Sequence, residues 1–187
     1  MRKNFGAKAW TYPQPVYMIA SYDENGVADV MNVAWGCIAG YKQIALYLDV
    51  KHQTTENILK RKAFSVSMGD ASCVEACDYV GIVSAKKEPQ KVEKAGFHVV
   101  KSNFVDAPLI EELPMAVECQ LLSYDKESEL MVGEIINVSV DERILDSDGN
   151  IDLSLFSPIT FDPVHNDYIT LGKKVGNAFE DGMKLKK

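Results

Sequence analysis

Short stretches in which apolar residues recur at every second position dominate this chain, and they favour a mainly antiparallel β-fold. Residues 15–22 and 27–35 alternate in this way on either side of the turn sequence DENG at residues 23–26. Further strands are predicted at residues 44–49 and 63–68, and residues 116–124 and 130–140 are expected to form a long hairpin. Helices of about ten residues between successive strands, which a parallel sheet requires, are not apparent.

Two short segments change to a helical period. Residues 54–61 form the first, with Thr54 as the expected N-cap. Ser72 and Glu75 have the spacing of a capping box and predict a second helix through about Tyr79. With six or seven strands and two or three short helices, the predicted fold is a closed or half-closed antiparallel barrel, because closure removes exposed strand edges.

Less regular segments separate and follow these elements. Residues 86–94 are charged and contain Pro89, so we expect a solvated loop with a turn or two of helix. The segment from Asp146 onward is rich in Gly, Asp and Pro and is expected to pack as loops over the barrel or over a partner subunit. On residues 130–140, one face carries Glu134 among apolar residues; if that face is buried, the carboxylate must be paired or hydrated.

Length and charge restrict the class of protein. With 187 residues the chain is expected to form one domain over residues 1–187, since domains average about 150 residues. The net charge of −7 has the wrong sign for wrapping nucleic acid. Neither a stretch of about 20 apolar residues nor a secretory signal is present. We therefore expect a cytoplasmic protein without a membrane span, with free thiols at its four cysteines.

Several strong chemical motifs are missing. Neither a dinucleotide-binding G-x-G-x-x-G turn, a phosphate-binding P-loop nor an H-E-x-x-H metal motif occurs. His52, His98 and His165 are scattered, with no Cys or carboxylate at ligand spacing, so no metal site is predicted. Cys73 and Cys77 are expected to share a helix face, but their spacing is not C-x-x-C, and packing explains them better than a thiol mechanism.

Two segments suggest a binding site. Residues 51–57 (KHQTTEN) place hydroxyls, an amide and two basic side chains at a helix start, where free backbone N–H groups favour a phosphate. Plain helix capping explains the same spacing and is the simpler interpretation. Residues 32–36 (NVAWG) combine polar, small and aromatic residues that let a planar ring approach the backbone. An ordinary core tryptophan is the alternative there.

Nine ordered motifs resemble those of the flavin reductase-like, or flavoredoxin, family, and together they extend from about residue 10 to 180. They are YPQPV at residues 12–16, SYDENG at 21–26, MNVAW at 31–35, TTENI at 54–58, DYVGIVS at 78–84, APLI at 107–110, and the pairs Glu118-Cys119, Gly133-Glu134 and Leu171-Gly172. The resemblance implies an FMN-binding split barrel that works as a homodimer, with flavin sites near the subunit interface and electron transfer through bound FMN.

The resemblance also implies roles for single residues. Thr54 matches a threonine at the phosphate end, and Trp35 matches a tryptophan close to the flavin. Lys91 aligns best with a family lysine, with Lys86 or Lys87 as alternatives, and Phe161 or Tyr168 would cover the ring. No catalytic or metal-binding residue is predicted. The predicted cofactor-binding residues are Asp29, Asn32, Val33, Ala34, Trp35, Lys51, His52, Thr54, Thr55, Asn57, Ser84, Lys91, Phe161 and Tyr168.

Three positions depart from the family pattern. Asp29 stands where relatives often have asparagine, and its charge would repel a phosphate unless a lysine neutralises it. Ala85 replaces a frequent glycine and disfavours a positive φ. Ser128 and Glu129 stand where relatives often carry a histidine before Gly-Glu; if that histidine helps select the electron donor, we expect a different donor for this chain.

Three functions are consistent with these features. The first is an FMN-dependent oxidoreductase that moves electrons from a reduced donor, such as NAD(P)H or a redox protein, through bound FMN to an acceptor. The alternative is a non-catalytic FMN-binding electron carrier that docks with a redox partner protein. A barrel that has lost its cofactor and only dimerises is the third, motivated by Asp29 and Ala85.

Overall fold

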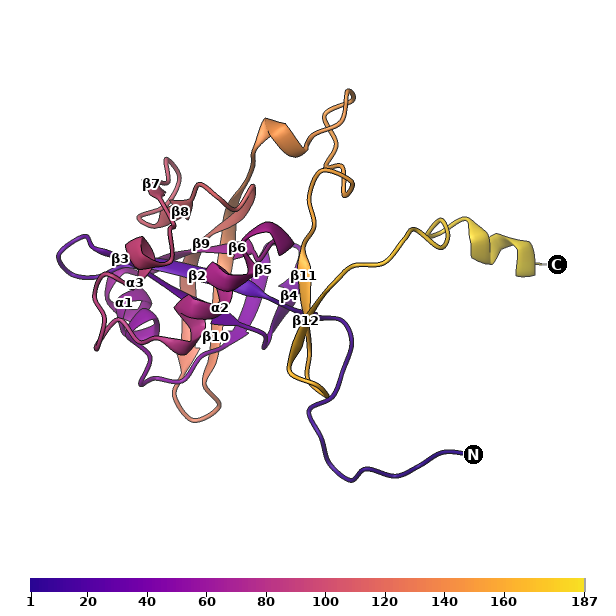
Figure 1. Cartoon of the computed structure of the whole chain (residues 1–187), viewed down its shortest axis with the longest axis horizontal. Helices are drawn as coiled ribbons and strands as arrows, with labels where there is room; N and C mark the ends of the chain where they lie inside the picture. Colours follow the sequence, from indigo (N-terminus) through magenta and orange to yellow (C-terminus); the bar gives the residue numbers. More distant parts are fainter. Residues whose placement is uncertain (187) are drawn as a thin grey trace.

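A seven-stranded antiparallel sheet that curls into a half-barrel forms the body of the molecule in the computed structural model, which describes residues 1–186 (Figure 1). Its strands are ordered β3-β2-β6-β9-β10-β5-β4. The predicted antiparallel barrel is therefore confirmed. The strand bounds are β2 (Tyr17–Tyr22), β3 (Ala28–Val33), β4 (Gly36–Gly40), β5 (Gln43–Tyr47), β6 (Ala63–Met68), β9 (Met115–Asp125) and β10 (Leu130–Val140).

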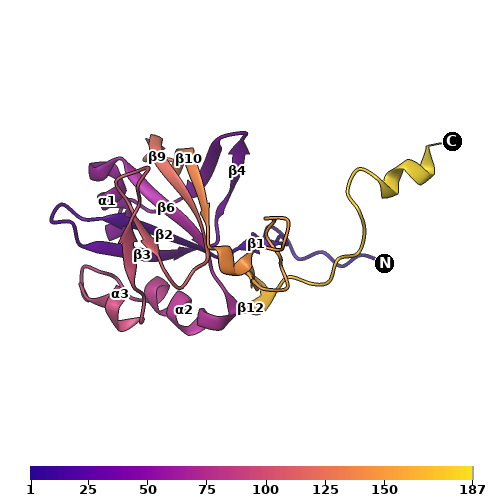
Figure 2. The same ribbon diagram turned by 90° about the horizontal axis from the view of Figure 1, so that it is seen from above.

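Short helices cover the β3 side of this sheet. Figure 2 shows α2 and α3 along one side of β3, while α1 packs on β2 and β3 at the end of the half-barrel. Three 3-10 turns complete the helical content of the described residues. The bounds are α1 (Gln53–Arg61), α2 (Val74–Ile82), α3 (Lys91–Lys94), η1 (Ala71–Cys73), η2 (Glu142–Ile144) and η3 (Asp181–Leu185).

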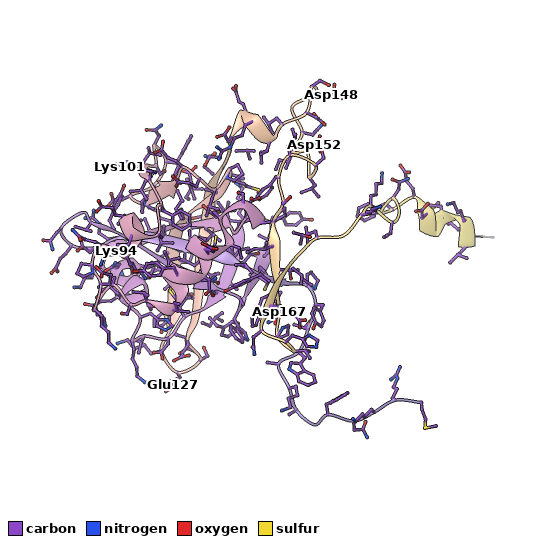
Figure 3. The ribbon with its side chains drawn as sticks, in the orientation of Figure 1. Lys94, Lys101, Glu127, Asp148, Asp152 and Asp167 are labelled. Carbon is purple, nitrogen blue, oxygen red and sulfur yellow. The ribbon has the colours of Figure 1, made fainter. Side chains whose placement is uncertain are left out.

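Smaller sheets flank the half-barrel. One joins β1 (Gln14–Pro15), β11 (Ile159–Asp162) and β12 (Asp167–Thr170), and the other is the hairpin of β7 (Val99–Lys101) and β8 (Pro108–Ile110). Both terminal segments extend away from the body on the side of β12 (Figures 1 and 2). In Figure 3 the labelled Asp148 and Asp152 lie on the loop that leads from β10 to β11, and Asp167 lies at the β12 hairpin.

The core has two parts because the sheet buries both of its faces. Inside the half-barrel, Phe64, Leu46 and Met131 are fully buried. On the other face, Met18 packs with Cys77 and other residues of the α2 and α3 region. Burial of each such side chain stabilises the fold by about 1.5–3 kcal/mol, so the two layers together fix the helices against β3.

Three sequence predictions about local structure were wrong. The segment after Asp146 contributes β11 and β12 rather than loops alone, while β4 at residues 36–40 was not predicted at all. Thr54 lies within α1, whose N-cap is His52. The predicted capping box at Ser72 is also wrong, because Asp70 caps η1 by accepting the Ser72 N–H and α2 begins only at Val74.

The single apolar face predicted on β10 is wrong, because the strand does not alternate regularly: beyond Ile136 the register changes, and Val138 pairs with Val117, which packs in the same cluster as Met131. Ile136 and Val138 are 42% and 45% exposed, whereas Met131 is fully buried. Glu134, on the predicted face, is partly exposed and so remains in contact with water. Register shifts on either side of residues 133–135 mark β-bulges in the β9–β10 hairpin. The half-barrel therefore presents some apolar residues of β10 to solvent.

None of the helices formed by residues 1–186 is long and apolar enough to cross a membrane.

Candidate functional site

Two adjoining cavities form one groove between β3, the start of α1 and the end of α2. The first, of about 300 Å³, lies among Thr54, Ser84 and Lys91, and the second, of about 250 Å³, lies among Trp35, Phe161 and Tyr168. Met31, Asn32 and His52 line both. The groove is therefore continuous, with a polar end and an aromatic end.

The aromatic end combines side chains from distant parts of the chain. Trp35 follows β3, Tyr47 ends β5, and both are about half exposed, at 52% and 53%. Phe161 and Tyr168 face each other across the β11–β12 pair, with ring centroids 6.3 Å apart. These rings offer flat apolar surface to a planar ligand while one side stays open to solvent.

Asn32 and Tyr168 are fixed by hydrogen bonds to α2. The Asn32 Nδ2 donates to the Cys77 carbonyl at 3.1 Å and to the Tyr168 hydroxyl oxygen at 3.2 Å. The Tyr168 hydroxyl donates to the Asp78 carboxylate at 2.7 Å. Burial, and then the neighbouring Asp78 carboxylate, raise the pKa of Tyr168 above its ordinary value, so this phenol stays protonated at neutral pH.

The polar end lies at the N-terminus of α1. This helix begins at Gln53 after His52, whose backbone is extended and whose side chain makes no capping hydrogen bond. Backbone N–H groups in the first turn of a helix lack intrahelical acceptors, so they favour an anion. Ser84, which follows α2, brings a hydroxyl to the same cavity. The end is therefore suited to a phosphate group.

A buried ion pair forms the floor of this end. The Lys91 Nζ lies 3.0 Å from Asp29 Oδ1, and both side chains are more than 95% buried. The same Nζ donates to the carbonyls of Val80 at 3.1 Å and Val83 at 3.0 Å. Thr54 donates its hydroxyl proton to the other Asp29 oxygen at 2.6 Å. Lys91 is thus the lysine that neutralises Asp29, and its three N–H groups are all engaged.

The buried Lys91 corrects the expectation of a solvated loop at residues 86–94. The α3 turn places Lys91 and Val92 in the interior, whereas Lys86 and Lys94 are exposed and form ion pairs at the surface. Lys91 tolerates burial because a carboxylate and two carbonyls surround its ammonium group.

The structure brings most of the predicted site residues to the groove. Asn57 lies at a neighbouring cavity that also contacts Asp29 and Gln53. Lys51 and Thr55 stand apart from these walls: Lys51 is exposed, and its carbonyl accepts a hydrogen bond from Lys86, while Thr55 is fully buried. The predicted residues that line the groove are Asp29, Asn32, Val33, Ala34, Trp35, His52, Thr54, Ser84, Lys91, Phe161 and Tyr168.

Sequence reasoning missed other walls of the groove. Gln53 lines the polar end because α1 begins one residue earlier than predicted, and Tyr47 reaches the aromatic end from β5. Residues 80–83 line it because α2 continues to Ile82. The motif at residues 78–84 was the available signal for this wall, whereas the approach of Tyr47 depends on how β4 and β5 pair.

His165 does have carboxylate neighbours, contrary to the sequence analysis. One ligand atom each from Asp162, His165 and Asp167 lies within 4.8 Å of the others. The His165 Nδ1 contacts Asp162 Oδ2 at 2.7 Å, and the Tyr12 hydroxyl donates to Asp162 Oδ1. Both Asp162 oxygens are thus occupied by protein hydrogen bonds in the β11–β12 turn.

The half-barrel and its groove define a split-barrel protein whose groove has a polar end suited to an anion and an aromatic end suited to a planar group. Residues 9–163 match the family model described as "Flavin reductase like domain". The chain belongs to this flavin reductase-like family.

Solved structures support this membership. Flavoredoxin of Desulfovibrio vulgaris (Miyazaki F) is 34% identical, with a TM-score of 0.92 over 97% of this chain and 100% of that one. Flavoredoxin from Methanosarcina acetivorans is 25% identical, with a TM-score of 0.89 over 99% of each chain. The FMN-binding domain of a flavin reductase-like enzyme from Shewanella baltica OS155 shares the fold, with a TM-score of 0.79 at 16% identity over 88% of this chain and 89% of that one.

Proposed function

We propose that this protein binds FMN in the groove and acts as an oxidoreductase, passing electrons from a reduced donor to an acceptor. The observation that carries the proposal is the continuous groove, with an uncapped helix start at one end and four aromatic side chains at the other. A flavin mononucleotide has this distribution of chemistry, since a ribityl chain separates its phosphate from its planar ring system.

The residues present fit such a ligand. Backbone N–H groups at the start of α1 and the Ser84 hydroxyl would hold the phosphate. The Asp29–Lys91 pair adds no net charge beneath it, which removes the repulsion that Asp29 alone would cause. Trp35 and Tyr168 would flank the ring. Bound FMN supplies the redox chemistry, and these residues bind it, orient it and exclude water from part of it.

The two departures that suggested a lost cofactor do not damage the groove. Lys91 neutralises Asp29. Ala85 is not among the positive-φ residues of the described chain, so it fills the position of a frequent glycine without backbone strain. Both observations favour a cofactor-binding protein over a barrel that only dimerises.

An NAD(P)H-dependent activity fits the open aromatic end. Half-exposed Trp35 and Tyr47 leave one side of the proposed ring position accessible, so a nicotinamide ring can approach it without a separate dinucleotide-binding fold. The same opening would serve direct electron transfer with a partner protein, which is the carrier alternative. The similar structures are named as flavoredoxins and as a domain of a flavin reductase-like enzyme, and these names support electron transfer by this protein. They fit both the NAD(P)H-dependent enzyme and the electron carrier.

One experiment tests FMN binding directly. FMN is titrated into the purified apoprotein and into Trp35→Ala, with flavin fluorescence as the readout. We expect saturable binding by the wild type, and altered fluorescence of the bound flavin in the variant, because the indole lies at the aromatic end. Absence of saturable binding by the wild type would contradict the proposal.

A second assay separates the enzyme from the carrier. The FMN-loaded protein is mixed with NADH or NADPH under air, and nicotinamide oxidation is followed in the steady state. Sustained turnover supports the oxidoreductase. Flavin binding without turnover supports the electron carrier.

We also propose a homodimer and a cytoplasmic location. Ile136 and Val138 on β10 and Leu122 on β9 are exposed apolar residues that a second copy would cover. Four free cysteines fit a reducing compartment.

A further inference from the structure

Cys73 and Cys77 lie together at the start of α2, behind the wall of the groove. Their Sγ atoms are 3.9 Å apart. Cys73 is partly exposed, and Cys77 is fully buried. Cys73 is the N-cap of α2, with φ −132° and ψ 33°, so its backbone lies outside the helical ladder. Because a disulfide has an S–S length of about 2.05 Å, the two Sγ atoms must move closer together for a bond to form.

The two thiols differ in acidity in the way that thiol exchange requires. A hydrogen bond from Cys77 lowers the pKa of Cys73 to about 7, although burial and the Asp70 carboxylate act in the opposite direction. The hydrogen bond to Cys73, together with burial, raises the pKa of Cys77. A partly exposed thiol of lowered pKa therefore lies beside a buried thiol of raised pKa, which is the usual arrangement of an attacking and a resolving cysteine.

We propose that Cys73 and Cys77 form a thiol–disulfide exchange site that takes low-molecular-weight disulfides such as oxidised glutathione. The Cys73 thiolate attacks one sulfur of the small disulfide, forms a mixed disulfide and releases the first small thiolate. Cys77 then gives its proton to that thiolate and attacks the Cys73 sulfur of the mixed disulfide. This attack releases the second small thiolate, which takes a proton from water. The two cysteines are oxidised to one disulfide, and the small disulfide is reduced to two thiols.

The oxidation state of this site is transmitted to the groove. The Cys77 carbonyl accepts the Asn32 amide at 3.1 Å, and the next residue, Asp78, accepts the Tyr168 hydroxyl at 2.7 Å. Asn32 and Tyr168 both line the aromatic end. A disulfide that pulls on Cys77 therefore shifts two hydrogen bonds that position the groove wall. This coupling, unlike the exchange site itself, rests on the proposed FMN function.

Mass spectrometry of the full-length protein tests the exchange site. The reduced protein is equilibrated in glutathione buffers of increasing oxidation, quenched by alkylation and mapped by peptide. We expect an intramolecular Cys73–Cys77 disulfide to replace two alkylated thiols. We expect Cys119 to be alkylated only once the protein is unfolded, because the thiol is buried and burial raises its pKa to about 12. Separate thiols at Cys73 and Cys77 across the whole series would overturn the proposal.

Variants separate the two steps. Cys77→Ser is expected to stop at a mixed disulfide on Cys73, and Cys73→Ser to leave Cys77 unmodified. Cys37→Ser is the matched control, since Cys37 is exposed and lies far along the chain on β4; this variant still forms the Cys73–Cys77 disulfide. If the core substitution at Cys77 unfolds the protein, the wild-type and Cys37→Ser peptide maps still decide the outcome.

An FMN titration of the dithiol and disulfide forms tests the coupling. We expect the disulfide form to bind about two- to tenfold more weakly, the effect of disturbing one or two hydrogen bonds. The Cys73→Ser protein, exposed to the same buffers, should show one affinity throughout. Equal affinities of the two wild-type forms would overturn the coupling. Failure of both forms to bind FMN would overturn the proposed function and leave the exchange site standing.

Discussion

At the scale of single residues, the buried pair of Asp29 and Lys91 shows what a sequence can and cannot predict. The sequence indicated that Asp29 needs a lysine, and the family resemblance separately named Lys91 as a cofactor-site residue without linking the two. It could not indicate that Lys91 is buried, because the charged segment at residues 86–94 has the composition of a solvated loop. Only the packing of α3 on β3 brings the ammonium within 3.0 Å of the carboxylate.

Asp29→Asn should have opposite effects on stability and on FMN binding. Removing one partner of a buried ion pair leaves Lys91 uncompensated, so we expect the free energy of unfolding to fall by about 3 kcal/mol. The positive charge beneath the polar end of the groove then strengthens phosphate binding, and the dissociation constant for FMN should decrease. Urea denaturation and a flavin titration measure the two quantities.

The double variant Asp29→Asn, Lys91→Met is the matched control for this prediction. It removes both charges, so most of the lost stability should return, while the gain in FMN affinity should disappear. A single variant as stable as the wild type would show that the pair does not behave as a buried ion pair.

At the scale of elements, long alternating strands were predictable and short ones were not. The bounds of β6 and β10 match the predicted residues because alternation over six or more residues leaves little choice of register. β11 and β12 have four residues each, separated by a polar turn, and β4 contains two glycines and an alanine. These strands form because neighbouring strands pair with them, and a short stretch of sequence does not show which strand will pair with it. The aromatic end of the groove was therefore only partly predictable.

Gly133 of β10 illustrates how closely the long hairpin packs. A Cβ atom at this position would lie 2.4 Å from the Cζ atom of Phe64, a fully buried side chain. We expect Gly133→Ala to destabilise the protein by about 1–3 kcal/mol through overpacking. Gly40→Ala in β4 meets no atom closer than 3.7 Å and should change stability much less. Thermal denaturation of both variants tests this, and equal melting temperatures would contradict it.

The β11–β12 turn should give a measurable pH dependence. The Asp162 carboxylate raises the pKa of His165 above 6.5, and hydrogen bonds from Tyr12 and then His165 lower that of Asp162 below 3.8. The His165 contribution to stability is therefore complete below pH 6.5 and is lost as the pH rises through the raised pKa. The Asp162 contribution is present above pH 3.8 and is lost as the pH falls through the lowered pKa.

NMR titration of the histidine ring protons measures the His165 pKa. We expect Asp162→Asn to return the His165 pKa towards 6.5. His98, whose pKa is raised by Glu112, should be unaffected in the same spectra and serves as an internal control. An unchanged His165 titration in the variant would show that its contact with Asp162 is not formed in solution.

At the scale of the whole molecule, two kinds of surface remain open: the exposed apolar residues Leu122, Ile136 and Val138 of β9 and β10, and the exposed side of Trp35 and Tyr47 at the groove. The alternation of β10 predicted one continuous apolar face, which is wrong because the bulge at Ile136 shifts the residues that follow it to the other face. A one-residue shift of register reverses the faces, and the sequence pattern does not show where a bulge falls. A second copy that covered Leu122, Ile136 and Val138 would account for apolar side chains at those positions.

Ile136→Lys tests that arrangement. Placing an ammonium group among these exposed apolar residues adds a desolvation cost to any dimer formed there, so we expect the dimer dissociation constant to rise at least about tenfold. Val100→Lys is the matched control, since Val100 is also exposed but lies on β7, in the separate β7–β8 hairpin (Figure 1). Sedimentation velocity over a concentration series measures both. If the subunit interface also closes the aromatic end of the groove, FMN affinity should fall together with dimerisation in Ile136→Lys. A wild-type protein that sediments as a monomer at every concentration would leave Trp35 and Tyr47 open to solvent and exclude a site shared between subunits.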